Sequence, residues 1–140
     1  MADNLVIREA TTEDASTLAD MNWQLIRDEG HSNPSTIPQL AERMAGWLES
    51  AYSALIVEAA GDPTVYGLWR DDGDIYIRQW FVCKGYRWAG LGRKLLDHAR
   101  ATFWAGRHLR IECLSGNTGG LAFWRGVGFR DYCITMTSDP

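Results

Sequence analysis

The hydrophobic pattern along this chain changes period several times, and each change predicts a change of secondary structure. Apolar residues recur at helical spacing at Ala15, Leu18, Ala19, Trp23 and Ile26, which places them on one face of a helix. The same period returns in three later stretches. The predicted helices begin near Thr12, Pro38, Gly90 and Thr118 and end near Gly30, Glu49, Gly106 and Arg125.

Short apolar runs rich in β-branched and aromatic residues lie between these helices and predict strands. The predicted strands are 5–10, 53–60, 64–70, 75–82, 108–114 and 129–137. Turn signals at 61–63 and 71–74 join the second, third and fourth strands, which indicates an antiparallel meander. The order β-α-α-β-β-β-α-β-α-β indicates a mixed α/β chain, and 140 residues fit one domain with one core.

A glycine-bearing turn, Arg87-x-x-Gly90-x-Gly92, joins the strand over 75–82 to the next helix. The first N–H groups of a helix have no partner within it, and the helix dipole favours negative charge there, so this turn predicts an anion site. Leu91 and Leu95 stand where a Walker loop and a dinucleotide fingerprint would need lysine and glycine. Taken alone, the turn fits a phosphate site and an ordinary surface turn about equally.

Charge is divided unevenly along the chain, whose net charge is −4. Residues 1–77 hold 14 acidic and 4 basic residues, whereas residues 78–140 hold 4 acidic and 10 basic residues. The basic part contains the glycine turn and suits a ligand with several phosphates. Because it has no dense basic cluster with interleaved aromatic residues, no nucleic-acid partner is predicted.

A second stretch, Asn117-Thr-Gly-Gly-Leu-Ala-Phe-Trp-Arg-Gly-Val-Gly-Phe129, follows about 25 residues later. Together the two stretches resemble the signature motifs of the GNAT superfamily of acetyl-CoA-dependent N-acetyltransferases. Gly120 and Trp124 depart from that pattern, in which alanine and tyrosine are usual. The resemblance runs from Leu5 to Thr137 and implies a single N-acetyltransferase domain over 5–140.

The resemblance also implies a fold, namely an α/β (α+β) domain with a mixed, mostly antiparallel twisted sheet of six or seven strands and helices on both faces. In such a sheet two neighbouring strands, here 75–82 and 109–114, splay apart and admit the pantetheine arm of the donor. An open edge at the last strand invites pairing, so a homodimer through this C-terminal edge is an expectation.

The resemblance implies that acetyl-CoA is the co-substrate and that the two motifs hold it. Its diphosphate would lie on backbone N–H groups from Arg87 to Arg93, and its pantetheine amides would pair with the backbone of 81–83. Asn117 would bind a pantetheine amide, cap the following helix, or do both. The residues predicted to bind acetyl-CoA are Phe81, Val82, Cys83, Arg87, Trp88, Ala89, Gly90, Leu91, Gly92, Arg93, Asn117, Phe123 and Trp124.

The implied reaction is direct attack of an amine on the thioester, with a backbone N–H near 80–82 facing the oxyanion. Among candidates for the base, His31 has the most suitable intrinsic pKa, although an exposed loop is the plainer interpretation of its position. Glu29, Tyr76 and Glu112 are the other candidates. Trp124 cannot donate a proton near neutral pH, so the thiolate would either leave unassisted or take a proton from Tyr86 or Tyr132, which are weaker candidates.

We therefore predict an N-acetyltransferase that moves an acetyl group from acetyl-CoA to a primary amine of a small molecule or peptide in a ternary complex. The alternative is a non-catalytic acyl-CoA-binding regulatory domain, because the usual tyrosine is missing. The acidic first half weakly favours a cationic acceptor, whereas Arg78 would be either a ligand for an acceptor carboxylate or a surface charge.

Localisation follows from what the sequence lacks. No apolar run approaches 18 residues and the N-terminus has no signal-peptide pattern, so a cytoplasmic protein without a membrane partner is expected. Cys83, Cys113 and Cys133 are expected to be buried free thiols within strands. No spacing of histidines or cysteines indicates a metal site.

Overall fold

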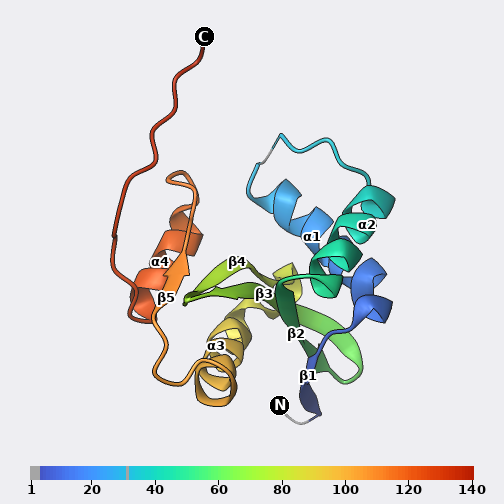
Figure 1. Ribbon diagram of the computed structural model, residues 1–140. Coiled ribbons are helices and arrows are strands. Elements are labelled where there is room, and N and C mark those ends of the chain that lie inside the picture. Colours follow the sequence, from blue (N-terminus) through green and yellow to red (C-terminus); the bar gives the residue numbers. More distant parts are fainter. Residues whose placement is uncertain (1–3, 31) are drawn as a thin grey trace.

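The computed structural model describes residues 4–30 and 32–140, the side chain of Trp88 excepted, and is built around one five-stranded sheet (Figure 1). The strands, in both chain and spatial order, are β1 (Leu5–Glu9), β2 (Tyr52–Ala59), β3 (Asp62–Asp72), β4 (Asp74–Val82) and β5 (Leu109–Ile111). Neighbours from β1 to β4 are antiparallel, and β5 runs parallel to β4. The predicted meander and the mixed, mostly antiparallel sheet are thus confirmed.

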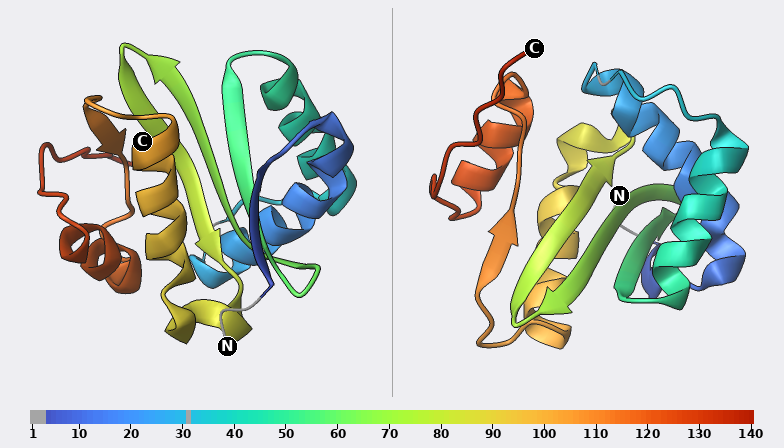
Figure 2. Two further views of the ribbon diagram at one scale, coloured as in Figure 1. Left: turned by 90° about the horizontal axis from the view of Figure 1, so that it is seen from below. Right: turned by 45° about the horizontal axis from the view of Figure 1, so that its top comes forward.

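Helices cover both faces of the sheet, as expected. They are α1 (Ala15–Asp28) after the 3-10 turn η1 (Thr12–Asp14), α2 (Ile37–Glu49), α3 (Leu91–Thr102) after the 3-10 turn η2 (Lys84–Ala89), and α4 (Thr118–Gly126). Thr36 caps α2, because its hydroxyl accepts from Gln39 N at 3.3 Å while the Gln39 side chain accepts from Thr36 N at 2.8 Å. Figure 2 shows α1 and α2 together on one face and α3 on the other.

Alternation along the strands supplies a separate core to each face. In β2, Tyr52, Ala54 and Ile56 pack with α1 and α2, whereas Leu55 and Val57 pack with the cluster that contains α3. The second cluster also holds an aromatic series on the α3 side. Its members are Trp69, Trp80, Trp104, Phe123, Trp124 and Phe129.

The end of the chain differs from expectation, because the sheet has five strands in the described residues rather than six or seven. Residues 129–137 form no strand there, and Figure 1 shows this segment extending away from α4. A strand needs a hydrogen-bonded neighbour, and none of the described strands pairs with this segment. The predicted strand over 108–114 is likewise shortened to Leu109–Ile111.

The cysteines also differ from expectation, although all three thiols are free. Cys83 follows β4 and Cys113 follows β5, so these two partly buried residues lie just outside strands. Cys133 is exposed. Among the helices described, none is long and apolar enough to cross a lipid bilayer.

Candidate active site

A groove opens where β4 and β5 stop pairing. The two strands are paired only at Ile75–Leu109, Tyr76–Arg110 and Ile77–Ile111, and β4 then continues to Val82 without β5 beside it. The groove is lined by the second half of β4, the end of α1, the start of α3 and the segment from β5 through α4. The separation of the two strands expected from the sequence is therefore present, and it exposes part of an edge of β4.

The backbone direction along β4 decides which residues face this groove. Cys83 N donates to Thr64 O at 2.8 Å, so its N–H points toward β3. Because alternate residues of a strand direct their N–H and C=O groups to the same side, Phe81 also faces β3, whereas Trp80 and Val82 face the groove. Of the three residues expected to pair with pantetheine, only Val82 offers its backbone to the opening.

The start of α3 lies at the same end of the groove. Gly90 has φ +68°, a left-handed conformation that glycine adopts readily, and no side chain caps the helix. The first i to i−4 bond of α3 runs from Lys94 N to Gly90 O at 3.0 Å, so the four preceding N–H groups, from Gly90 to Arg93, have no acceptor inside the helix. These N–H groups and the positive end of the helix dipole are chemically suited to receive an anion.

Gly92 serves close packing at this helix start. A Cβ atom there would lie 3.1 Å from Val82 Cγ2 and 3.4 Å from Phe123, so α3 sits tightly against β4 and α4. Trp80 Nε1 donates to Gly92 O at 3.2 Å and holds the same junction from the strand. Leu91 is buried in the core, whereas Ala89 is exposed at the end of η2.

The two arginines of the first motif have different environments. Arg87 donates from Nε to Val82 O at 3.0 Å, pairs with Asp28 at the end of α1, and lies over the Phe81 ring. Arg93 is exposed at the groove and forms no ion pair within the described part of the chain. Arg93 is thus ready to meet an anion, whereas Arg87 would first have to release Asp28.

Asn117 connects two elements across the groove. Its Oδ1 accepts from Gly120 N at 2.9 Å and so caps α4, and its Nδ2 donates to Glu29 Oε2 at 2.9 Å. Gly120 makes this cap fit, because a Cβ atom there would lie 2.4 Å from Nδ2. The cap expected at Asn117 is confirmed, and one amide hydrogen of its NH₂ group is still available to a ligand.

Phe123 and Trp124 contribute packing to the floor of the site. Trp124 is 7% exposed, and its ring centroid lies 4.9 Å from that of Phe123 and 5.0 Å from that of Phe129. The ring also contacts Trp80. Trp124 therefore fills the core at the position where the motif that the sequence resembles usually has tyrosine.

Tyr76 and Glu112 form a hydrogen-bonded pair within the groove lining. Tyr76 Oη donates to Glu112 Oε1 at 2.8 Å. Burial and the hydrogen bond to Glu112 raise the pKa of Tyr76, so this phenol keeps its proton near neutral pH. Tyr76 can therefore relay a proton toward the Glu112 carboxylate, but it is no strong base by itself.

One of the remaining candidates for the base lies at the end of α1. Glu29 is the C-cap residue of that helix, follows Asp28, and lines the groove. His31 lies outside the described residues. In the described residues, no group of three or more histidine, cysteine or acidic side chains is arranged to hold a metal ion.

Sequence reasoning missed a polar network on the α1/α2 side of the groove. Arg43 donates to Asn22 Oδ1 at 3.0 Å, and the fully buried Tyr66 donates to Gln79 Oε1 at 2.9 Å. Burial raises the pKa of Tyr66, so its hydroxyl acts as a permanent donor. The sequence held one indication of this network. Arg43 and Trp47 are four residues apart on a predicted helix, so they share one helix face, and the Arg43 guanidinium does lie over the Trp47 ring.

Comparisons with known proteins agree with this geometry. Residues 18–129 match the family model described as the acetyltransferase (GNAT) family. A search of curated proteins found no match. Several solved structures share the fold at low sequence identity.

Three of these structures span essentially the whole chain. A mutant BH1408 protein from Bacillus halodurans has a TM-score of 0.81 and 20% identity, covering 96% of this chain and 99% of that one. The aminoglycoside N-acetyltransferase AAC(6')-Iy in complex with CoA has a TM-score of 0.78 and 13% identity, covering 98% and 95%. An aminoglycoside acetyltransferase, meta-AAC0020, from an uncultured soil metagenomic sample has a TM-score of 0.79 and 14% identity, covering 100% and 99%. With the family model matching most of its length, this chain belongs to the GNAT family of acetyltransferases.

Proposed function

We propose that this chain transfers an acetyl group from acetyl-CoA to a primary amine of a small molecule or peptide, by direct attack in a ternary complex. The proposal rests on one observation, namely that two features suited to bind CoA lie next to each other. The uncapped start of α3 lies beside the exposed edge of β4, so an anion-binding helix end adjoins unpaired strand backbone. The complex of CoA with AAC(6')-Iy, which shares the fold, supports the same donor.

The donor would be held by groups that the site already presents. The N–H groups from Gly90 to Arg93 would receive the diphosphate, with a charge-assisted bond from Arg93 and a second from Arg87 once it leaves Asp28. The pantetheine arm would run along β4 and pair with Val82 on the groove side. The spare amide hydrogen of Asn117 would meet a pantetheine carbonyl.

The chemistry requires an oxyanion site and a base. The N–H group of Trp80 points into the groove and is suited to stabilise the oxyanion as the amine nitrogen adds to the thioester carbon. Glu112 would take the amine proton through Tyr76, and Glu29 and His31 are the other candidates. Because Trp124 carries no acidic proton, the leaving thiolate would depart without one, its pKa being near that of a free thiol, about 8.5.

The direct test is thiol release from acetyl-CoA by the purified protein with a panel of primary amines. We expect release with at least one amine, and loss of about tenfold to a hundredfold in kcat for Glu112→Gln if that carboxylate accepts the proton. If no amine causes release of the thiol although CoA binds saturably, the proposal that this chain is an acetyltransferase is wrong.

The second candidate is a regulatory domain that binds acyl-CoA without turnover, and the burial of Trp124 favours it. In that case wild-type protein would bind CoA without releasing thiol, and Trp124→Tyr would restore release. Robust turnover by the wild type would exclude this candidate.

A further inference from the structure

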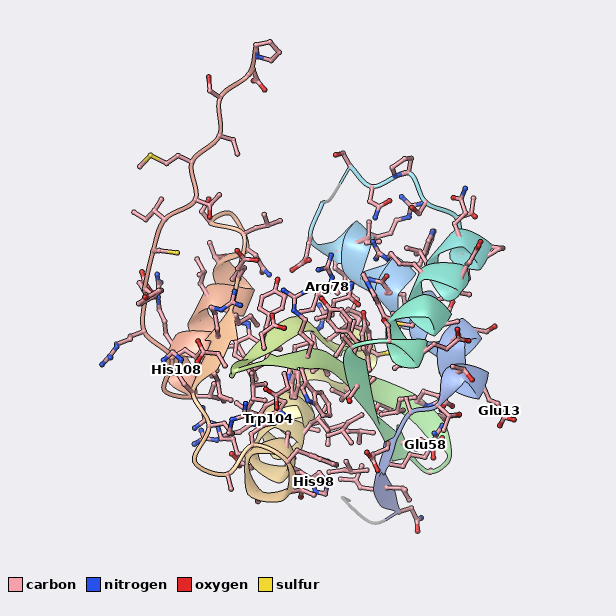
Figure 3. The ribbon with its side chains drawn as sticks, in the orientation of Figure 1. Glu13, Glu58, Arg78, His98, Trp104 and His108 are labelled. Carbon is pink, nitrogen blue, oxygen red and sulfur yellow. The ribbon has the colours of Figure 1, made fainter. Side chains whose placement is uncertain are left out.

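Two arginines converge on one indole at the α1/α2 side of the groove. The guanidinium carbon of Arg43, on α2, lies 4.4 Å from the Trp47 ring centroid, and that of Arg78, on β4, lies 4.7 Å from it. Both arginines line the groove. Figure 3 shows Arg78 on the α1/α2 side of the sheet and Trp104 on the α3 side.

A bulge in β4 places Arg78 at this point. The pairing of β3 with β4 passes from Leu68–Gln79 to Trp69–Ile77, so Arg78 has no direct partner on β3. Such a bulge turns a side chain away from its regular direction. Arg78 then donates to Tyr52 Oη at 3.3 Å, which holds its guanidinium near Trp47.

No carboxylate within the described part of the chain pairs with either arginine. Elsewhere Arg8 pairs with Asp14, Arg70 with Asp72 and Arg107 with Asp71. Of these pairs, Arg70–Asp72 lies close to Arg78, because Arg70 and Arg78 both donate to Tyr52 Oη.

Arg43 also has unused donors. Its single hydrogen bond to a described residue goes to Asn22, and its Nε is buried without a partner there. Burial and the positive charge of Arg78 lower the pKa of Arg43, so holding the two cations together has an electrostatic cost. An anion bound beside both guanidinium groups would offset that cost.

Carboxylates lie on the same groove but are engaged differently. Glu112 accepts from Tyr76, and Glu29 accepts from Asn117. The positive charge of Arg78 acts on the pKa of Tyr76, and all four residues line the groove. The Tyr76–Glu112 pair and the two arginines therefore border one space. The space thus has a cationic side and a side with hydrogen-bonded carboxylates.

We propose that the acceptor is a primary amine that also carries a carboxylate, such as a free amino acid, with its carboxylate bound by Arg43 and Arg78. This inference rests on the proposed acetyltransferase function, because it names the acceptor of that reaction. The amine would then lie toward Glu112. A polycationic amine would meet two unneutralised arginines, so the charge of the lining opposes the cationic acceptor suggested by the acidic first half of the sequence.

The test is equilibrium binding by calorimetry to the full protein saturated with CoA, with L-amino acids titrated one at a time. Each amino acid is compared with its carboxamide, which keeps the amine and removes the anion, and with spermidine as a polycationic amine. We expect at least one amino acid to bind about tenfold more tightly than its carboxamide, as loss of a charge-assisted bond implies. Arg78→Gln should weaken binding of that amino acid by about tenfold and leave binding of the carboxamide unchanged.

Arg27→Gln is the matched control, because Arg27 also stacks on an indole, 4.2 Å from the Trp23 centroid, but does not line the groove. Arg78→Lys keeps the charge without the planar fork and should fall between wild type and Arg78→Gln. Equal binding of acid and carboxamide, tighter binding of spermidine, or binding of no amino acid would overturn the inference. Thiol release with any amine in a parallel assay separates such a result from failure of the acetyltransferase proposal.

Discussion

The Trp80 ring can lie close to β3 only because its partner there, Gly67, has no side chain. A Cβ atom at Gly67 would lie 2.1 Å from the Trp80 ring, which itself contacts Trp104 and Trp124. Gly67→Ala must displace that ring in a packed core, so it should lower the free energy of unfolding by about 1–3 kcal/mol. Chemical denaturation measures this.

Gly46→Ala is the control for that change. Gly46 lies in α2 with open space around the position of a Cβ atom, so alanine there should stabilise the protein by about 0.5–1 kcal/mol. Equal effects of the two substitutions would contradict the packing role of Gly67.

Individual residues of the site were predictable from the sequence to different degrees. The motif spacing predicted that Gly90 precedes a helix start and that Asn117 caps the next helix, because both are local properties of the backbone. The meeting of Arg43 with Arg78 was not predictable, because it depends on a bulge in β4 and on how α2 packs against the sheet. A register shift is decided by tertiary contacts that no short pattern reports.

In the proposed function, donor binding depends on the start of α3. Arg93 in its first turn lines the groove, whereas its neighbour Lys94 does not. Arg93→Gln should therefore weaken CoA binding about tenfold, as loss of a charge-assisted bond to phosphate implies. Calorimetry measures the affinity of wild type and variant for CoA and for pantetheine, a ligand that lacks the diphosphate.

Lys94→Gln removes one positive charge from the same turn and serves as the control. It should leave CoA affinity nearly unchanged, and pantetheine affinity should respond to neither substitution. A similar loss of CoA affinity in both variants would mean that only the general charge of this helix end matters, contrary to a specific contact at Arg93.

The junction of β1 with η1 and α1 should give stability a measurable pH dependence. Arg8 in β1 donates to Asp14 at 2.8 and 3.0 Å, and Thr11 N also donates to Asp14. The hydrogen bond from Arg8, aided by that from Thr11, lowers the pKa of Asp14 below its ordinary value of 3.8. A lowered folded-state pKa adds stability above the ordinary value, and this stability is lost as pH falls through the folded-state pKa.

Asp14→Asn should accordingly cost about 1 kcal/mol of stability at neutral pH, and the difference from wild type should shrink below about pH 4. Urea denaturation across this pH range measures it. Asp20→Asn changes an exposed carboxylate of α1 whose one hydrogen-bond donor among the described residues is Gln24, so its effect on stability should be small across this pH range. A pH-independent cost for Asp14→Asn would rule out the ionic contribution.

Elements with a strong internal pattern were predicted well, and elements that depend on a neighbour were not. Local sequence determines the apolar faces of α1 and α3 and the turns between β2, β3 and β4. The segment 129–137 has an equally good strand pattern but forms no strand among the described residues. Periodicity indicates which side chains would share a face, and pairing also needs an open partner edge.

At the scale of the whole molecule, the segment 129–137 exposes apolar side chains to solvent. Tyr132, Ile134 and Met136 alternate along it and are 89%, 80% and 83% exposed. β5 forms an edge of the described sheet with a partner on one side. Exposed alternating apolar residues and an open strand edge favour pairing between two copies of the chain.

We therefore expect a concentration-dependent dimer in which this segment of one copy adds to the β5 edge of the other. Ile134→Asp places a charge among the alternating apolar side chains and should shift the protein toward monomer, as sedimentation velocity would show, because burying an unpaired charge is costly. Thr135→Asp adds the same charge to the opposite side of the segment and should shift it less. Wild-type protein that stays monomeric at high concentration, or equal effects of the two substitutions, would mean that the segment does not mediate self-association.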